Sequence, residues 1–275
     1  MNKKITVRNL WLLLLLLIVS ACSYPTPTLA PDPTNTAAPL TTETPPATEA
    51  PLATPSLAAS NGKCRNAYYP VREGATWTYS STGGPAGGYG FSDTITSVRE
   101  DGFTLTSQFG SLTRNQEWAC QPEGLVALQL GGTSAAILND DNMQATLNVD
   151  HVSGVTFPST INPRDTWQHA LEFTGQITVA GQGIDAKGDA QSSFEAVDYE
   201  SVTVPAGTFE ALKIHVNTTI NINGNFNGVS FPVKVTTPYD YWFVKDVGWV
   251  KASGTGDVGG ETFSETIELQ SYNIP

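Results

Sequence analysis

The chain has 275 residues, of which 40% are hydrophobic and 15% are charged, and its formal net charge at pH 7 is −12. An acidic protein of this kind is repelled by nucleic acids and by anionic lipid headgroups, so the composition excludes nucleic-acid partners. The part of the chain after residue 61 is long enough for one large β domain or two small ones.

The first 21 residues have the pattern of a secretory signal peptide. Three basic residues come first, Lys3, Lys4 and Arg8, and an unbroken apolar run follows from residue 10 to residue 19. That run is too short to span a bilayer comfortably, which distinguishes it from a transmembrane helix. The pattern predicts export across the cell membrane.

The signal peptide ends at the motif Val19-Ser20-Ala21-Cys22. This motif resembles the lipobox of bacterial lipoproteins, in which the cysteine thiol takes a diacylglyceryl group and becomes the new N-terminus. The resemblance implies that Cys22 is lipidated and anchors the protein on the extracytoplasmic side of a membrane, because two acyl chains give stable attachment. Ordinary cleavage near Ala21, which would release a soluble protein with a free thiol, is the alternative. Ser23 is compatible with either membrane of a two-membrane cell, or with a single membrane.

Residues 22–61 are predicted to be the lipidated cysteine followed by a disordered linker. Positions 23–61 hold nine of the chain's 18 Pro and nine Thr, with few large apolar residues. Such a segment cannot bury enough surface to offset the entropy cost of ordering itself. At about 3.1 Å per residue, its upper reach is on the order of 120 Å. O-glycosylation of the Thr residues is a less favoured alternative to a bare linker.

Two further cysteines, Cys64 and Cys120, remain after the anchor. Outside the cytoplasm, two cysteines in one domain most often form a disulfide. Closing this loop of 57 residues, both cysteines included, is worth about 4 kcal/mol in the chain-entropy model. Two free thiols or half of a metal site are the alternatives. No C-x-x-C or H-x-x-x-H spacing accompanies the cysteines, which disfavours a metal site.

Residues 62–275 are predicted to form an all-β domain. Thr, Val, Ile, Phe, Tyr and Trp recur in short alternating runs, and no stretch keeps a helical period over three turns. Asp101-Gly102 is expected at the tip of a hairpin that joins 92–99 to 103–109. Val204-Pro205-Ala206-Gly207 has Pro and Gly where turns favour them. We therefore expect a large curved antiparallel sheet, as a half-barrel (clam) or a sandwich.

The clearest strand is expected from Phe209 to Asn223. Apolar and polar side chains alternate along it, as in an antiparallel sheet that is covered on one face. The apolar face comprises Leu212, Ile214, Val216, Ile220 and Ile222. The strand exceeds the usual length of about 3–10 residues, so it is expected to bend or bulge. Asn223-Gly224 and Asn227-Gly228 are predicted to turn the chain into the next strand, Val229–Thr237.

A weak internal repeat runs through the domain. The order aromatic-Pro, Thr-Trp, Trp, Gly-apolar-Val occurs twice and predicts two related halves, 62–150 and 151–275, within one curved sheet. The first copy comprises Tyr69-Pro70, Thr76-Trp77, Trp118 and Gly124-Leu125-Val126, and the second comprises Phe157-Pro158, Thr166-Trp167, Trp242 and Gly248-Trp249-Val250. The alternative is that these short patterns are common in strands generally.

Two segments resemble a signature of uncharacterised exported bacterial β-domain families. They are Val202–Ile214 (VTVPAGTFEALKI), and Tyr241-Trp242-Phe243 followed by Val247–Lys251 (VGWVK). Some of these families are similar in architecture to the lipoprotein-carrier clam, a curved antiparallel sheet around an apolar groove. The resemblance covers roughly a fifth of the chain. It implies an apolar groove under the sheet and transfers no catalytic residue; the helices that line the carrier groove have no counterpart in this sequence.

Three histidines are the candidates for acid–base chemistry. On the expected strand 166–174, His169 shares a face with apolar neighbours, which indicates a histidine in the core or in a groove wall. His215 lies on the polar face of the long strand and is expected to be solvated. His151 follows Asp150 in an expected loop. No G-x-S-x-G motif supplies a nucleophile. We therefore expect no enzyme, and a hydrolase that uses His169 or His215 is the least favoured alternative.

The cluster Asn139-Asp140-Asp141-Asn142 is dense in oxygen ligands of the kind that Ca²⁺ prefers. It lacks the alternating spacing of an EF-hand loop, so a solvated turn is favoured over a cation site. No glycine-rich phosphate loop occurs between a strand and a helix. The sequence therefore predicts neither a metal nor a cofactor.

Aromatic residues are the remaining candidates for ligand contacts. In Pro238–Phe243, alternation places Tyr239, Tyr241 and Phe243 on one strand face and Trp242 on the other. A set that faces solvent could stack on sugar rings or hold an apolar ligand, although core packing is the default for such residues.

These observations predict a lipid-anchored extracytoplasmic lipoprotein that binds a ligand or a protein. The partner would be an apolar small molecule, a glycan or an envelope protein. A pocket is expected along Leu212, Ile214 and Val216, or beside Trp167 and Phe173. The alternative is a structural or envelope-assembly lipoprotein that acts through its outer face.

Overall fold

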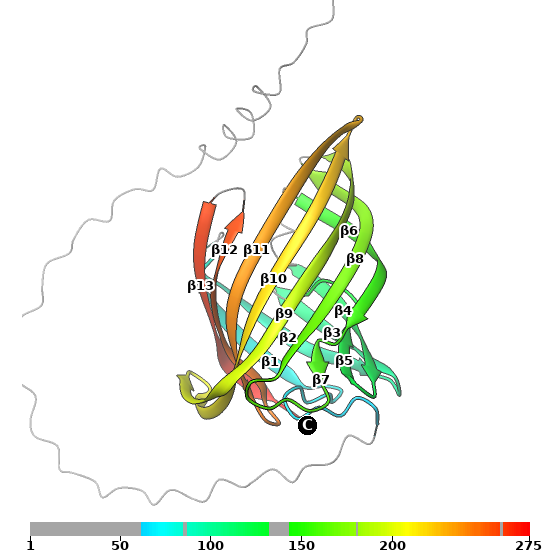
Figure 1. Ribbon diagram of the computed structural model, residues 1–275. Coiled ribbons are helices and arrows are strands. Elements are labelled where there is room, and N and C mark those ends of the chain that lie inside the picture. Colours follow the sequence, from blue (N-terminus) through cyan, green and yellow to red (C-terminus); the bar gives the residue numbers. More distant parts are fainter. Residues whose placement is uncertain (1–61, 85–86, 132–142, 180, 259–260) are drawn as a thin grey trace, which may run out of the picture. The chain divides into compact units, whose positions relative to one another are not determined.

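The computed structural model describes residues 62–84, 87–131, 143–179, 181–258 and 261–275, all outside the signal peptide and linker. These residues form strands and connecting turns without any helix, which confirms the all-β prediction (Figure 1). None of the described segments is therefore an apolar helix that could cross a membrane. The predictions for the signal peptide, Cys22, the linker and the 139–142 cluster lie outside the described residues.

Thirteen strands make up the described part of the chain. They are β1 (Thr76–Gly83), β2 (Tyr89–Val98), β3 (Gly102–Phe109), β4 (Leu112–Gln121), β5 (Gly124–Ala127), β6 (Met143–Gly154), β7 (Phe157–Pro158), β8 (Thr166–Val179), β9 (Gln182–Val204), β10 (Gly207–Phe226), β11 (Val229–Val244), β12 (Gly248–Val258) and β13 (Glu261–Asn273).

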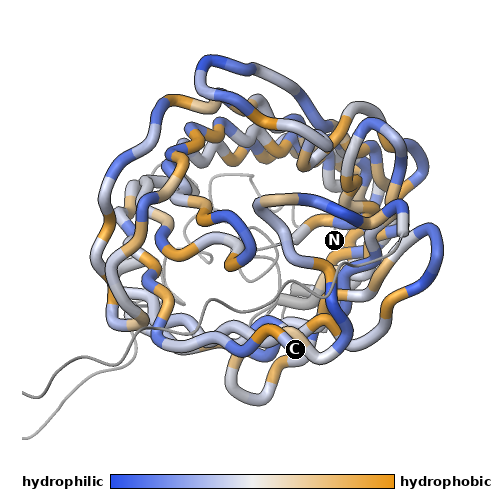
Figure 2. Tube along the Cα trace, turned by 90° about the horizontal axis from the view of Figure 1, so that it is seen from below, coloured by the Kyte–Doolittle hydropathy of each residue, from blue (hydrophilic) through white to orange (hydrophobic). Residues whose placement is uncertain are grey.

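All thirteen strands belong to one antiparallel sheet with the order β6-β8-β9-β10-β11-β12-β13-β1-β2-β3-β4-β5-β7. Pairing of β13 with β1 places the last strand beside the first, in the middle of the sheet. Seen end-on in Figure 2, the sheet curls around a common interior, so the half-barrel prediction is confirmed and the sandwich alternative is not.

The two penultimate strands, β5 and β8, are joined by the short connection between β6 and β7. The backbone N–H of Val155 donates to Gln168 O on β8 at 3.1 Å, and the next N–H, of Thr156, donates to Leu125 O on β5 at 2.9 Å. Successive residues thus bind strands near opposite edges of the sheet. We call residues 155–156 with their partners on β5 and β8 the seam.

The long strands β9, β10 and β11 form the tall side of the curled sheet (Figure 1). As predicted for a strand of this length, the β9–β10 register shifts between Leu212 and Ile214, which marks a bulge. The predicted turn at Asn223-Gly224 is wrong, because β10 continues through it and turns only at Asn227-Gly228. Gly224 pairs with Phe231, whose ring covers it; a Cβ there would lie 2.4 Å from Phe231 Cζ.

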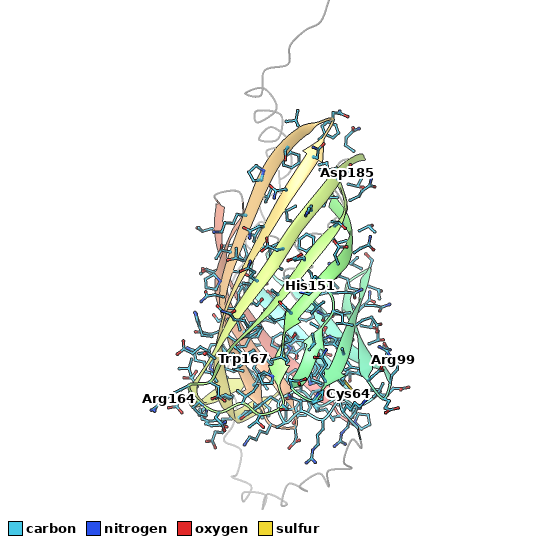
Figure 3. All side chains as sticks on the ribbon, turned by 45° about the vertical axis from the view of Figure 1, so that its right-hand side comes forward. Cys64, Arg99, His151, Arg164, Trp167 and Asp185 are labelled. Carbon is cyan, nitrogen blue, oxygen red and sulfur yellow. A yellow bond between two sulfur atoms is a disulfide. The ribbon has the colours of Figure 1, made fainter. Side chains whose placement is uncertain are left out.

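Residues 62–75 pack against the end of the curled sheet where Cys64 lies (Figure 3). Cys64 and Cys120 form the disulfide that the sequence predicts and attach this segment to β4. Asn66 Nδ2 donates to Pro158 O at 2.9 Å, and the Gly74 N–H donates to Ile95 O at 2.8 Å. Because several elements hold it, the segment forms a fixed end wall, which we call the end segment.

Two series of strands, β1–β5 and β8–β12, follow the same order of motifs, and each begins at a Thr-Trp pair. The predicted boundary between residues 150 and 151 is wrong, because it falls inside β6. The motif tryptophans also differ: Trp118 faces the interior, whereas Trp242 faces outward. The turn after β4 has two residues, whereas the turn after β11 has three. The extra residue shifts the alternation by one position, so Phe243 faces the interior in place of Trp242. A duplication of the two series stays a prediction.

Gly188 on β9 tests how closely neighbouring strands and side chains pack in the sheet. A Cβ at this position would lie 2.1 Å from Asn221 O and 2.9 Å from Phe173 Cζ. We expect Gly188→Ala to cost about 1–3 kcal/mol, because a backbone atom cannot move aside cheaply. Gly183→Ala, on the same strand with nothing within 4 Å, is the matched control. Urea denaturation should show loss of stability for the first variant alone; equal stabilities would contradict the close approach.

Candidate functional site

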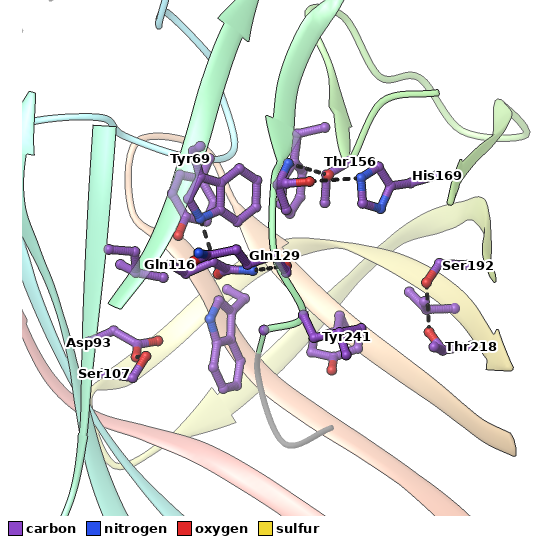
Figure 4. A pocket seen from close by; sticks show the side chains of 18 of the residues that line it. Tyr69, Asp93, Ser107, Gln116, Gln129, Thr156, His169, Ser192, Thr218 and Tyr241 are labelled. Carbon is purple, nitrogen blue, oxygen red and sulfur yellow. Dashed lines mark hydrogen bonds between the residues drawn. The ribbon is translucent and has the colours of Figure 1, made fainter. Parts of the chain in front are cut away.

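A cavity of about 230 Å³ lies on the concave face of the sheet and is partly open to solvent (Figure 4). Side chains from both sides of the seam line it. Six of its aromatic residues are Phe91, Trp118, Phe157, Phe194, Tyr241 and Trp249. Such a largely apolar hollow with a few polar groups has the general character of a small-molecule site.

The aromatic wall is held by ring contacts that leave little freedom. Tyr79 and Trp249 stack with their ring centroids 3.8 Å apart and 8° between planes, and Phe91 lies 5.0 Å from Tyr79. Tyr69, from the end segment, lies 5.2 Å from Trp118. Rings that pack on one another in this way form a preformed surface.

The predicted pocket residues are placed as follows. Ile214 and Val216 line the cavity, whereas Leu212 is buried beside it without lining it. Trp167 stacks on Phe194, with centroids 5.2 Å apart, and donates its indole N–H to Thr156 O at the seam. Phe173 belongs to a second apolar cluster, on β6 and β8–β11. Of the two predicted apolar faces, the one with Ile214 and Val216 therefore lines the cavity directly.

The predicted faces of residues 239–243 are confirmed. Tyr241 and Phe243 line the cavity, and Tyr239 is buried on the same side. Trp242 lies on the outer face, where its indole N–H donates to Glu200 and Lys213 Nζ lies 5.2 Å from its ring.

Asp93 is the one carboxylate among the described residues of the cavity wall. It lies on β2 opposite Ser107 on β3, and Ser107 Oγ donates to Asp93 Oδ1 at 2.5 Å. Only 9% of Asp93 is exposed, and burial raises the pKa of its carboxyl to about 6, against the opposing effect of the Ser107 hydrogen bond. The sequence analysis missed Asp93, although its period-two spacing from Phe91 and Ile95 was an available signal.

His169 lies on the side of the cavity away from Asp93 (Figure 4) and is 7% exposed. Its Nε2 is 2.9 Å from Ala127 O, and a carbonyl only accepts, so Nε2 carries the proton. Burial lowers the pKa of His169, and the Ala127 hydrogen bond partly opposes this. The prediction of a groove-wall histidine is confirmed; the side chain connects β8 to β5 across the seam.

A second buried carboxylate, Glu265, lies on β13 outside the cavity lining. Ser81 Oγ and Tyr239 OH each donate to it at 2.6 Å, and it is 3% exposed. Burial, and then the charge of Glu265, raise the pKa of Tyr89, and burial, followed by the hydrogen bond to Glu265, raises the pKa of Tyr239. Glu265 is therefore surrounded by hydroxyl donors, which stabilise a buried carboxylate.

His215 lies on the outer face of β10. Its Nδ1 is 2.8 Å from Asp240 Oδ1, and Asn217 Nδ2 donates to its Nε2 at 3.1 Å. Partial burial raises the pKa of Asp240, but hydrogen bonds from Lys213 and His215 outweigh this and leave the pKa below its usual value. Among the described residues, no serine or threonine hydroxyl is hydrogen-bonded to either ring nitrogen, so this dyad has no nucleophile in place.

The prediction that His151 lies in a loop is wrong. It lies on β6, just after the register shift that begins at Val149, and it is exposed (Figure 3). The alternation that would have shown a strand is broken there by the bulge. No group of three or more potential metal ligands occurs among the described residues.

Removing the Asp93 charge should stabilise the folded protein at alkaline pH. Its folded pKa of about 6 exceeds the unfolded value of 3.8, so the folded state loses stability as pH rises through this window. We expect Asp93→Asn to gain up to about 3 kcal/mol at pH 8 and almost nothing at pH 4. The effect of His169, which titrates in both proteins, cancels in the difference.

Urea denaturation of Asp93→Asn and the unchanged protein at pH 4, 6 and 8 measures this difference. Glu172→Gln, which removes an exposed carboxylate from β8, is the control and should show no comparable trend. A stability difference that does not grow with pH would show that Asp93 titrates normally.

No family model matches the sequence, and no curated protein sequence matches it. Three solved structures are similar in fold. One is a protein described as exported, with a YmcC-like fold, from Bacteroides fragilis, at 12% identity over 76% of this chain and 100% of that chain, with a TM-score of 0.44. Another is described as a lipoprotein from Parabacteroides distasonis, at 17% identity over 76% and 99%, with a TM-score of 0.41. The third is the hypothetical lipoprotein YmcC from Escherichia coli, at 9% identity over 73% and 85%, with a TM-score of 0.31. These values do not assign the chain to a family.

Proposed function

We propose that this protein is a lipid-anchored, extracytoplasmic binding module that holds an apolar small molecule inside the curled sheet. The observation that carries the proposal is the aromatic cavity of about 230 Å³, with rings from both sides of the seam in its wall. Its wall is preformed, so little ordering entropy would be lost on binding.

The size and lining of the cavity favour some partners over others. Its volume is slightly below the range of about 300–1,000 Å³ for drug-sized ligands, which favours a small molecule or the end of a longer chain. A glycan is less favoured, because its many hydroxyls would need hydrogen-bond partners and the described lining is largely apolar. Among the residues that the structure describes, no hydroxyl is hydrogen-bonded to His215 of the His215–Asp240 pair, so the pair lends no support to a hydrolase.

A second candidate is a structural or envelope-assembly role. The first residues of β11 include Val229, which is 64% exposed, and the exposed Phe231 and Val233. Exposed apolar side chains that lie together can mark a protein contact. This feature lies at the tip of the tall strands and is independent of the cavity.

Binding of a neutral apolar probe tests the ligand-binding proposal. N-phenyl-1-naphthylamine fluoresces in apolar surroundings, and we expect it to bind residues 62–275 in the cavity. Ala190→Leu, which adds volume to the lining, should weaken binding about tenfold or more, because a filled cavity excludes the probe. Ala119→Leu, on the outer face of β4, is the matched control.

Quenching of tryptophan by the bound probe gives a second readout, since Trp118 and Trp249 lie in the wall. The stability of each variant is measured in parallel. Absence of binding to the folded protein, or equal binding by Ala190→Leu, would overturn the cavity proposal and leave the outer face as the candidate.

The anchor is tested separately through Cys22. We expect the full-length chain to incorporate labelled palmitate and to fractionate with membranes, because two acyl chains attach a protein stably. Cys22→Ser should lose the label and move to the soluble extracytoplasmic fraction. Unlabelled protein with unchanged fractionation in both forms would rule out lipidation at this residue.

A further inference from the structure

Asp93 is an exception on the inner face of β2. Its neighbours on that face are Phe91 and Ile95, both buried, and a carboxylate among such residues is costly unless it is paired. Ser107 bonds to Oδ1, and no hydrogen bond from a described residue reaches Oδ2. Every fully buried side-chain oxygen of the described residues has a hydrogen-bond partner. Because Oδ2 has no such partner, it is not fully buried, and it faces the open space of the cavity that Asp93 lines.

The comparison with Glu265 shows that this arrangement is specific to Asp93. Both carboxylates lie on the concave face, and both are at least nine-tenths buried. Glu265 receives hydrogen bonds from Ser81 and Tyr239 and does not line the cavity. Asp93 has one hydroxyl donor and lines it, so its charge is available to something inside the cavity.

The charged and titratable groups packed around Asp93 do not neutralise it. The end segment contributes Tyr69 and β1 contributes Tyr79, and burial, followed by the repulsion of Asp93, raises the pKa of both phenols. On β4, Arg114 stands opposite Ser107; burial lowers its pKa, and it has an interaction of its own. The described residues of the cavity lining include no Lys or Arg. Their one histidine, His169, donates its Nε2–H to Ala127 O.

We propose that the cavity selects ligands in which a cationic nitrogen, as an ammonium or a quaternary ammonium, is attached to an apolar body. The nitrogen would lie at Asp93 Oδ2, and the apolar body would lie against the aromatic wall. This inference rests on the proposed binding function and specifies its ligand class. Aromatic ring faces attract cations as well, so the wall and the carboxylate favour the same charge.

Binding of a cation should depend on pH. The carboxyl of Asp93 has a pKa of about 6, so it is mostly neutral at pH 5 and ionised at pH 8. Selectivity for the cation should therefore appear as pH rises through about 6. A quaternary ammonium keeps its charge throughout, so any change with pH belongs to the protein.

The experiment compares three probes with the same chain: octyltrimethylammonium, 1-octanol and octyl sulfate, each below its micelle concentration. Displacement of N-phenyl-1-naphthylamine, measured as loss of its fluorescence and recovery of tryptophan emission, reports binding to residues 62–275. At pH 8, the cation should bind about tenfold or more tightly than the alcohol, and the sulfate more weakly than either. At pH 5, the preference for the cation over the alcohol should fall to about threefold or less.

Two variants connect the preference to Asp93. Asp93→Asn should lower the ratio of cation to alcohol affinity at pH 8 to about threefold or less, as expected for the neutral carboxyl at pH 5. Ser107→Ala removes the hydrogen bond that lowers the Asp93 pKa, so the preference should persist at pH 8 with its midpoint at higher pH. Glu172→Gln, which removes an exposed carboxylate, should leave the ratio and its midpoint unchanged.

The outcomes separate this inference from the proposed function. If all three probes bind equally, the cationic selectivity is wrong while ligand binding stands. If Asp93→Asn keeps the full preference, Asp93 is not the group that selects the cation, and the inference fails in that way. If neither N-phenyl-1-naphthylamine nor any octyl probe binds to the folded protein, the proposed function fails and the selectivity fails with it.

Discussion

The structure depends on the hydrogen bonds of Thr156 at the seam. Its N–H donates to Leu125 O, its hydroxyl accepts from the Ala127 N–H at 2.9 Å, and its carbonyl accepts from Trp167 Nε1 at 3.1 Å. The first two bonds reach β5 and the third reaches β8, so one residue spans both sides of the seam. A curled sheet with free edges would expose unpaired backbone groups at the place where its walls meet. Here those groups are used to bring the walls together, and the cavity lies within the part that they join.

Fixing the seam and the end segment accounts for the position of the cavity. The disulfide at Cys64 attaches the end segment to β4, and Tyr69 from that segment forms part of the cavity wall. The tall strands β9–β11 extend away from this end and carry their own apolar cluster. Side chains that converge from a closed wall must pack at close to native density, and the space they leave is lined by rings that cannot collapse further without breaking their mutual contacts.

The sequence predicts strands and faces well because both follow from a period of two. The inward side of Tyr241 was accessible in this way, whereas the hairpin near Asp101-Gly102 followed from its turn residues and the bulge in β10 from the length of the strand. The turn predicted at Asn223-Gly224 is wrong because Gly224 leaves space for the Phe231 ring rather than turning the chain. The seam was inaccessible, because it depends on β5 and β8 meeting after the chain has passed through β6. Asp93 was accessible from its alternation with apolar residues but looked like one of many acids until its surroundings were known.

The two buried carboxylates differ in a way that incomplete packing of the interior does not explain. Glu265 is satisfied by hydroxyls from β1 and β11, which is how a sheet accommodates a charge that serves structure alone. Asp93 is held by Ser107 from one side only, and burial raises its pKa, which means that the fold bears a cost for keeping it ionised. An apolar residue at this position would continue the face formed by Phe91 and Ile95 and would avoid that cost. Under our proposal, a charge that is kept at this cost and faces an aromatic space serves to bind the ligand rather than to stabilise the sheet.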